Sequence, residues 1–180
     1  SYVEPIARRL EAPIFMPLNV GTPGMLEAVF ERITEEWGRL DIVLHSIAFA
    51  PKEDLRGALI DCSAEGFKQA MDISCHSFVR MARLAAPLMK NGGTLFAMSY
   101  YGANKVVPSY NVMGPVKAAL EACCRYLAYE LGGKRIRVHA ISIHNDECDA
   151  LWLSAGVLGP DEHSAALEPM GTFGLETSRQ

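Results

Sequence analysis

Tyr110 and Lys117 are the two residues best suited by type and spacing to proton chemistry. They lie in a segment, residues 110–131, whose apolar pattern predicts a helix. Since their spacing is about two helical turns, both side chains are expected on one face. A lysine ammonium beside a tyrosine hydroxyl favours the phenolate, which makes the tyrosine a better proton donor to a reacting group. The spacing alone is weak evidence, because a half-buried tyrosine and a solvated lysine at this interval are far more common.

Two further segments are expected at the same place in the fold as this pair. Residues 99–103 close a predicted strand at 94–99, and residues 45–51 close another at 40–46. In an open α/β sheet, ligands bind outside the carboxyl ends of the strands. All three segments should therefore meet at one rim of a sheet.

Apolar periodicity predicts alternating helices and strands along the chain. This pattern is typical of βαβ units, in which a helix connects two parallel strands. Thr22 is expected as the N-cap of the second helix, with Pro23 at its first position. Asp72 and Ser74 interrupt the third helix, either as ordinary polar positions or as a kink. The predicted helices span residues 2–11, 22–37, 63–89 and 110–131, and the predicted strands span residues 14–20, 40–46, 94–99 and 136–141.

The composition is that of an ordinary globular chain. Its 180 residues are 49% apolar and 21% charged, which is enough for one domain with a core. The net charge of −4 gives no electrostatic reason to expect nucleic acid or an anionic membrane as a partner. No segment reaches the ~18–20 apolar residues of a membrane span, and no secretory leader opens the chain, so a cytoplasmic location is expected.

No metal site is expected from the spacing of cysteine, histidine and carboxylate residues. The five cysteines are odd in number and match no metal template. They are expected as reduced thiols, mostly buried, in a cytosolic protein. His144, Asp146, Cys148 and Asp149 lie close together but match no strong ligand spacing either.

Three motifs make the sequence resemble a known family. H-S-I-A-F-A-P at residues 45–51, S-Y-Y-G-A at 99–103 and Y-N-V-M-G-x-x-K-A at 110–118 are similar, almost letter for letter, to NADH-dependent enoyl-[acyl-carrier-protein] reductases of bacterial fatty acid synthesis. These belong to the short-chain dehydrogenase/reductase superfamily, and the likeness runs from about residue 2 to about residue 142. The resemblance implies an α/β fold, a Rossmann-like doubly wound parallel sheet in α/β/α layers that lacks the first βαβ segment.

The resemblance also implies a role for each matching position. Tyr110 would donate a hydrogen bond to the thioester carbonyl of the substrate and stabilise the enolate. Lys117 would hold the nicotinamide ribose hydroxyls, and Tyr100 would line the acyl pocket beside the reacting carbon. The further contacts implied with the NADH cofactor are Asn19, Val20, Ser46, Ile47, Ala48 and Ser99. The further contacts implied with the substrate are Phe49, Ala50 and Leu55, at the pocket mouth.

The sequence departs from the family's pattern at three places. The family begins with a strand, a glycine-rich turn and a helix that hold the cofactor pyrophosphate, and these are not among the 180 residues. Asn19 stands where the family usually has aspartate, and residues 143–145 replace its usual glycine- and proline-containing turn. We therefore predict a partial Rossmann-like reductase domain at residues 1–142 and a divergent tail at 143–180. Truncation, a shifted reading frame or true divergence would each explain these departures.

Three functions are open at this point. The first is an oxidoreductase that reduces the 2,3 double bond of trans-2-enoyl-[acyl-carrier-protein] with NADH in fatty acid elongation. The second is a catalytically inactive, cofactor-free truncated relative. The third is a short-chain reductase acting on a ketone or alcohol, against which the Y-x6-K spacing argues, because ketoreductases use Y-x3-K and Gly114 occupies that fourth position.

The resemblance further implies partners for the chain. An enoyl thioester on acyl carrier protein is the expected substrate, and neither nucleic acid nor a membrane is expected. Members of the family are commonly homotetramers, and here the helices at 63–89 and 110–131 would pair. Small residues in these helices would permit such packing, although they would serve a core within the chain equally well.

Overall fold

Three parallel strands form the sheet of this protein, whose computed structural model describes residues 3–143. β1 (Ile42–His45), β2 (Gly93–Tyr100) and β3 (Ile136–Ile143) lie in the order β1-β2-β3, and both pairings are parallel. Because parallel strands cannot be joined by a tight turn, each connection crosses back through a helix. The predicted Rossmann-like parallel sheet is therefore confirmed. The four clustered residues considered for a metal, and the rest of the predicted tail beyond β3, lie outside the described residues.

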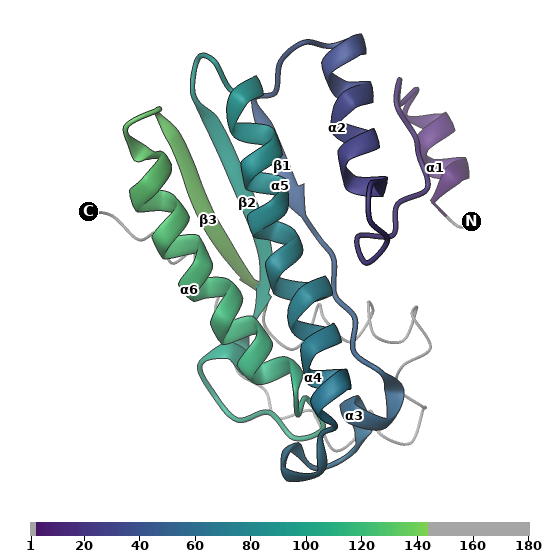
Figure 1. The fold of residues 1–180 in the computed structure, drawn as a ribbon, viewed down its shortest axis with the longest axis vertical. Helices are drawn as coiled ribbons and strands as arrows, with labels where there is room; N and C mark the ends of the chain where they lie inside the picture. Colours follow the sequence, from purple (N-terminus) through teal and green to yellow (C-terminus); the bar gives the residue numbers. More distant parts are fainter. Residues whose placement is uncertain (1–2, 144–180) are drawn as a thin grey trace.

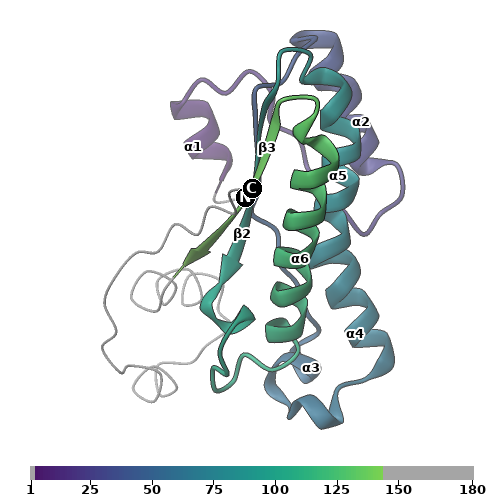
Figure 2. The ribbon, with the colours of Figure 1, turned by 90° about the vertical axis from the view of Figure 1, so that its left-hand side faces the viewer.

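The helices lie mainly on one face of the sheet. α2 (Met25–Glu36), α4 (Ala64–Met71), α5 (Ser77–Ala85) and α6 (Met113–Gly132) form that layer, while α1 (Glu4–Arg9) lies on the opposite side (Figure 1; Figure 2). α5 contacts β1, and α6 contacts β2 and β3. Among the helices described, none has the length and apolar character needed to cross a membrane. The shorter elements are α3 (Lys52–Arg56), η1 (Leu59–Asp61), η2 (Asp72–His76), η3 (Ala86–Leu88) and η4 (Tyr101–Ala103).

Alternation along the strands decides which side chains enter the core. Val43 and Leu95 are paired in register, and both are buried on the face that the helices cover. Ile42 and Leu44 point to the other face of β1 and are 65% and 53% exposed. From the helix layer, Leu120 of α6 is fully buried. The core therefore lies between the sheet and the layer of α4, α5 and α6.

A π-helical turn interrupts the helix predicted at residues 63–89. Residues 64–88 are continuously helical, but η2 within them is a π-helix. The segment begins at Ser63, whose side chain accepts a hydrogen bond from the amide of Gly66 at 2.9 Å, so Ser63 is its N-cap. A π turn inserts an extra residue into a helix and often lies beside a functional site. The sequence allowed either ordinary polar positions or a kink at Asp72 and Ser74, and the structure has a π turn there.

The strand predicted at residues 14–20 is not formed. A strand needs a neighbour to receive its backbone hydrogen bonds, and none of the three described strands pairs with this segment. Pro17 also lacks the amide hydrogen that a ladder requires. The prediction was wrong because an apolar run indicates burial but does not supply a pairing partner.

The start of α2 also differs from the prediction. Gly24 is the N-cap rather than Thr22, and its φ of +84° lies in the left-handed region. Thr22 contributes its carbonyl oxygen, which accepts a hydrogen bond from the amide of Met25 at 3.3 Å. Glycine adopts this φ without a Cβ clash, so the chain turns after Pro23 instead of starting the helix there.

Leu120→Ala should lower the free energy of unfolding by about 2–5 kcal/mol, because Leu120 is fully buried and its removal leaves a cavity. Leu10→Ala is the matched control, since Leu10 is 70% exposed, and it should change stability by less than about 0.5 kcal/mol. Urea unfolding of both variants measures the difference. Equal losses would contradict the core described above.

Candidate active site

A pair of tyrosines marks the carboxyl end of β2. Tyr100 ends the strand, and Tyr110 lies on the loop that leads into α6. Their ring centroids are 4.6 Å apart and their planes are inclined at 61°, which is an edge-to-face contact. Gly102 packs directly against this pair, because a Cβ at that position would lie 2.4 Å from Cδ1 of Tyr110. The missing side chain at Gly102 therefore allows Tyr110 to approach the end of the strand.

The turn before α6 corrects one prediction. α6 begins at Met113, so Tyr110 precedes the helix rather than lying on it. Ser109 and Asn111 have φ values of 64° and 42°, which a helix cannot include. The prediction that Tyr110 and Lys117 share one helix face was wrong, because apolar periodicity does not report left-handed backbone. Both side chains are nevertheless buried, at 7% and 5% exposure.

Lys117 is a buried cation near the carboxyl end of the sheet. Its Nζ donates a hydrogen bond to the carbonyl oxygen of Met98 at 2.7 Å. An ammonium that leaves water without such an acceptor costs several kcal/mol. The bond therefore ties the first turns of α6 to the last residues of β2.

His45 ends β1 and is fully buried. Its Nε2 lies 2.7 Å from Oγ of Ser77, and its ring packs against Phe78 with centroids 5.4 Å apart. Burial, reinforced by the positive charge of Lys117, lowers the pKa of His45 to about 4. The imidazole is therefore neutral at pH 7, as expected of a structural histidine.

Ser99 points from β2 toward α6. Its Oγ donates to Oε1 of Glu121 at 2.5 Å, and Nδ2 of Asn104 donates to Oε2 of the same carboxylate at 3.2 Å. One carboxylate thus joins the end of β2, the following loop and the helix. Ser99 is 3% exposed, and the cofactor contact implied for it stays a prediction.

The segment after β1 carries five of the predicted contacts. Its exposed members are Ser46, Ala48 and Phe49, and its half-buried members, which pack against the core, are Ile47 and Ala50. Ser74 of the π turn holds this segment through Phe49: its Oγ accepts from the Phe49 amide at 2.8 Å and donates to the Phe49 carbonyl at 2.9 Å. The helix layer therefore fixes the path of the loop that leaves β1.

The other predicted contacts lie in two places. Val20 is buried in the core at the start of the turn before α2, and the exposed Asn19 accepts a hydrogen bond on Oδ1 from the amide of Gly21 at 3.0 Å. Leu55 of α3 is 8% exposed, and its carbonyl oxygen accepts from Nδ2 of Asn111 at 2.6 Å. This hydrogen bond joins Leu55 to the loop that carries Tyr110.

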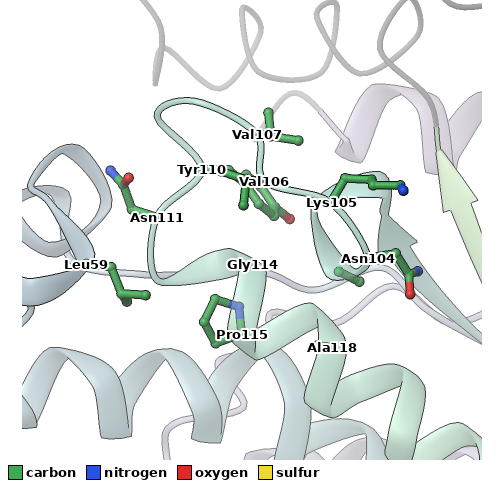
Figure 3. Close-up of a pocket in the computed structure, with 12 residues that line it drawn as sticks. Leu59, Asn104, Lys105, Val106, Val107, Tyr110, Asn111, Gly114, Pro115 and Ala118 are labelled. Carbon is green, nitrogen blue, oxygen red and sulfur yellow. The ribbon is translucent and has the colours of Figure 1, made fainter.

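An open cavity of about 460 Å³ adjoins Tyr110. Figure 3 shows it beside the loop of residues 103–107 and the first turns of α6. Its walls include Leu59, Val106 and Pro115, with Lys105 near one side. A mostly apolar cavity with a few polar groups is usual for a small-molecule site.

Sequence reasoning assigned no role to four residues that organise this site. Gly102 and Asn111 lie inside two of the recognised motifs, so their positions carried a signal that was not used. Glu121 lies one helical turn after Lys117, and that spacing places both on one face. Ser74 had no feature that distinguishes it from an ordinary polar residue.

Gly102→Ala should displace the Tyr110 ring, because the new Cβ would lie 2.4 Å from its Cδ1. The expected cost is about 1–3 kcal/mol of unfolding free energy, with a changed near-ultraviolet circular dichroism signal from the tyrosine pair. Gly132→Ala is the matched control, because nothing lies within 4 Å of the added Cβ apart from its chain neighbours and the backbone of its own helix. A stable Gly102→Ala protein with an unaltered tyrosine signal would contradict the packing.

Acid should destabilise the protein partly through His45. Its folded pKa of about 4 lies below the ordinary 6.5, so its contribution is complete above pH 6.5 and is lost as pH falls toward 4. The loss amounts to at most about 3 kcal/mol. His45→Gln should therefore lose less stability than the natural protein between pH 7 and pH 4.5 in urea unfolding. The same loss in both proteins would show that His45 does not titrate in this way.

Comparison with known proteins identifies the family of the chain. The model of the family described as Enoyl-(Acyl carrier protein) reductase matches residues 1–168, so the likeness continues past residue 142, where the sequence resemblance was expected to end. An NADH enoyl-[acyl-carrier-protein] reductase of Rickettsia conorii is 45% identical over 140 residues, which are 78% of this chain and 54% of that protein. One of Aquifex aeolicus is 42% identical over 170 residues, 94% of this chain and 63% of that protein.

Solved structures of enoyl-(acyl-carrier-protein) reductases are also similar to this chain. An enoyl-(acyl-carrier-protein) reductase of Anaplasma phagocytophilum in complex with NAD is similar with a TM-score of 0.76 and 43% identity, over 84% of this chain and 60% of that chain. The reductase of Aquifex aeolicus gives a TM-score of 0.77 and 45% identity, over 79% and 57%. The chain thus spans between about half and two-thirds of the length of these proteins. The match over most of its own length shows that it belongs to the enoyl-(acyl carrier protein) reductase family.

Proposed function

We propose that this chain carries the catalytic residues of an NADH-dependent reductase acting on the 2,3 double bond of trans-2-enoyl-[acyl-carrier-protein] in fatty acid elongation. The observation that carries the proposal is the buried Tyr100–Tyr110 pair at the carboxyl end of β2, with the buried ammonium of Lys117 on the adjoining helix. Carboxyl ends of parallel strands are where folds of this class bind dinucleotides and substrates.

The residues at this rim fit part of a dinucleotide cofactor. The exposed Ser46 and Ala48 follow β1, and Lys117 supplies an ammonium that hydrogen-bonds sugar hydroxyls well. We assign the nicotinamide end to these residues with Ile47 and Ser99, and the adenine end to Asn19 and Val20. When bound, NADH supplies the hydride. No glycine-rich turn between a strand and a helix occurs within residues 3–143, so none of these residues is assigned to the cofactor pyrophosphate.

The substrate roles follow from charge development at the thioester. Addition of a hydride to the β-carbon moves negative charge onto the carbonyl oxygen, and a hydrogen bond aimed at that oxygen stabilises the enolate. We assign this donor to the Tyr110 hydroxyl, since the Tyr110 ring lies at the carboxyl end of β2 against Tyr100. Tyr100 lines the acyl pocket beside the reacting carbon, and Ala50 and Leu55 form its mouth.

We further propose a cytoplasmic homotetramer, as the resemblance implies. Ala82 and Ala85 of α5 are buried within this chain, so they serve its own core rather than a contact with a second copy. Tyr126 and Tyr129 on α6 are 71% and 78% exposed, which leaves aromatic surface available for assembly.

The test is NADH oxidation by the 180-residue chain with a short trans-2-enoyl thioester. Tyr110→Phe should lower turnover about 10²–10³-fold, because it removes the donor to the enolate oxygen. Tyr126→Phe is the matched control, since this tyrosine is exposed and outside the site, and it should retain full turnover. Absence of both turnover and NADH binding would instead support a catalytically inactive, cofactor-free relative.

A further inference from the structure

The short helix α3 is held in place from outside. It has 5 residues, too few to be stable without tertiary contacts. The last carbonyls of any helix have no partner within it, and the carbonyl of Leu55 is one of these. It accepts a hydrogen bond of 2.6 Å from Nδ2 of Asn111, which is 56 residues further along the chain. An amide side chain from the turn before α6 thus caps the end of α3.

A second tether restrains α3 on another side. Oδ1 of Asp54 accepts from the amide of Ser63 at 2.6 Å, and Oδ2 accepts from the Ser63 hydroxyl at 3.1 Å. This tether joins α3 to the start of α4, whereas the bond from Asn111 joins it to the loop of Tyr110. Loss of the Asn111 bond would therefore free α3 from the loop of Tyr110, whereas loss of the Asp54 bonds would free it from the start of α4.

The backbone of Asn111 is shaped for this contact. Its φ of 42° is left-handed, a conformation that asparagine tolerates better than most residues. In Figure 3 its side chain projects away from Tyr110, on the far side of the turn. Asn111 thus aims its own amide at α3, while the ring of the preceding Tyr110 contacts Tyr100.

We propose that Asn111 is a positioning residue, which latches α3 to the turn of Tyr110 and so fixes the pocket mouth assigned to Leu55 relative to the reacting carbonyl. The role in substrate binding rests on the proposed function, whereas the latch itself does not. Loss of the amide frees the end of α3 but leaves the Tyr100–Tyr110 contact in place. Substrate binding should therefore weaken more than the chemical step.

Trypsin digestion tests the latch without any assay of activity. α3 contains Lys52 and Arg56, and cleavage after either requires local opening. Asn111→Gly removes the amide but keeps a residue that accepts positive φ. It should raise the cleavage rate in α3 about tenfold, as expected for the loss of one partly buried hydrogen bond, relative to cleavage after Arg32 in α2. Asn91→Gly, in the exposed turn at the opposite end of β2, is the matched control and should leave that ratio unchanged.

A second variant separates the hydrogen bond from the backbone. Asn111→Asp keeps a side chain that tolerates left-handed φ but turns a carboxylate, which only accepts, toward the Leu55 carbonyl. It should accelerate cleavage in α3 at least as much as Asn111→Gly. Cleavage as slow as in the natural protein, in either variant, would overturn the latch.

Steady-state kinetics test the effect on the substrate. With the enoyl thioester varied, Asn111→Gly should raise KM about five- to tenfold and change kcat by less than about twofold. Faster cleavage with an unchanged KM would overturn the positioning role. If the natural chain shows no turnover, the proposed function fails, and the cleavage rates still decide the latch independently.

Discussion

Burial of the positive charge on Lys117 constrains how α6 lies on β2 and which charge His45 carries. An ammonium withdrawn from water needs an acceptor of fixed position, and the Met98 carbonyl provides one. That carbonyl belongs to β2, so the helix carrying Lys117 cannot slide along the sheet without breaking this hydrogen bond. The same charge disfavours a second cation nearby, which is one reason that His45 at the end of β1 stays neutral. The rim of the sheet therefore carries the ammonium of Lys117 beside a neutral His45.

Polar side chains hold the segments that follow the strands. Ser74 fixes the loop after β1, Glu121 fixes the loop after β2, and Asn111 fixes the end of α3. Irregular backbone has polar groups that no ladder satisfies, so each loop needs partners of this kind. Ser74 and Glu121 belong to helices, whereas Asn111 belongs to the loop before α6, so helices and a neighbouring loop both position these segments. Such positioning gives flexible segments the precision that a binding site requires.

The sheet could be predicted from the sequence, whereas the turns around the tyrosines could not. Residues 94–99 and 136–141 are apolar runs that coincide with β2 and β3 to within two residues at each end, because burial between layers requires such runs. The run at 14–20 has the same character, yet forming a strand also depends on a partner elsewhere. The left-handed backbone at Asn111 likewise accompanies a hydrogen bond to the distant Leu55. Local pattern contains none of this long-range information.

The π turn at η2 sets the rotational phase of the helix that follows it. Removing its extra residue would turn α5 by about 100° relative to α4, since an α-helix has 3.6 residues per turn. Phe78 and Ala82 would then leave the core, and Ser77 would lose His45. Chain length between residues 72 and 76 is therefore as constrained as residue type. Insertions and deletions acquired during evolution should be excluded from this stretch while they accumulate in the surrounding loops.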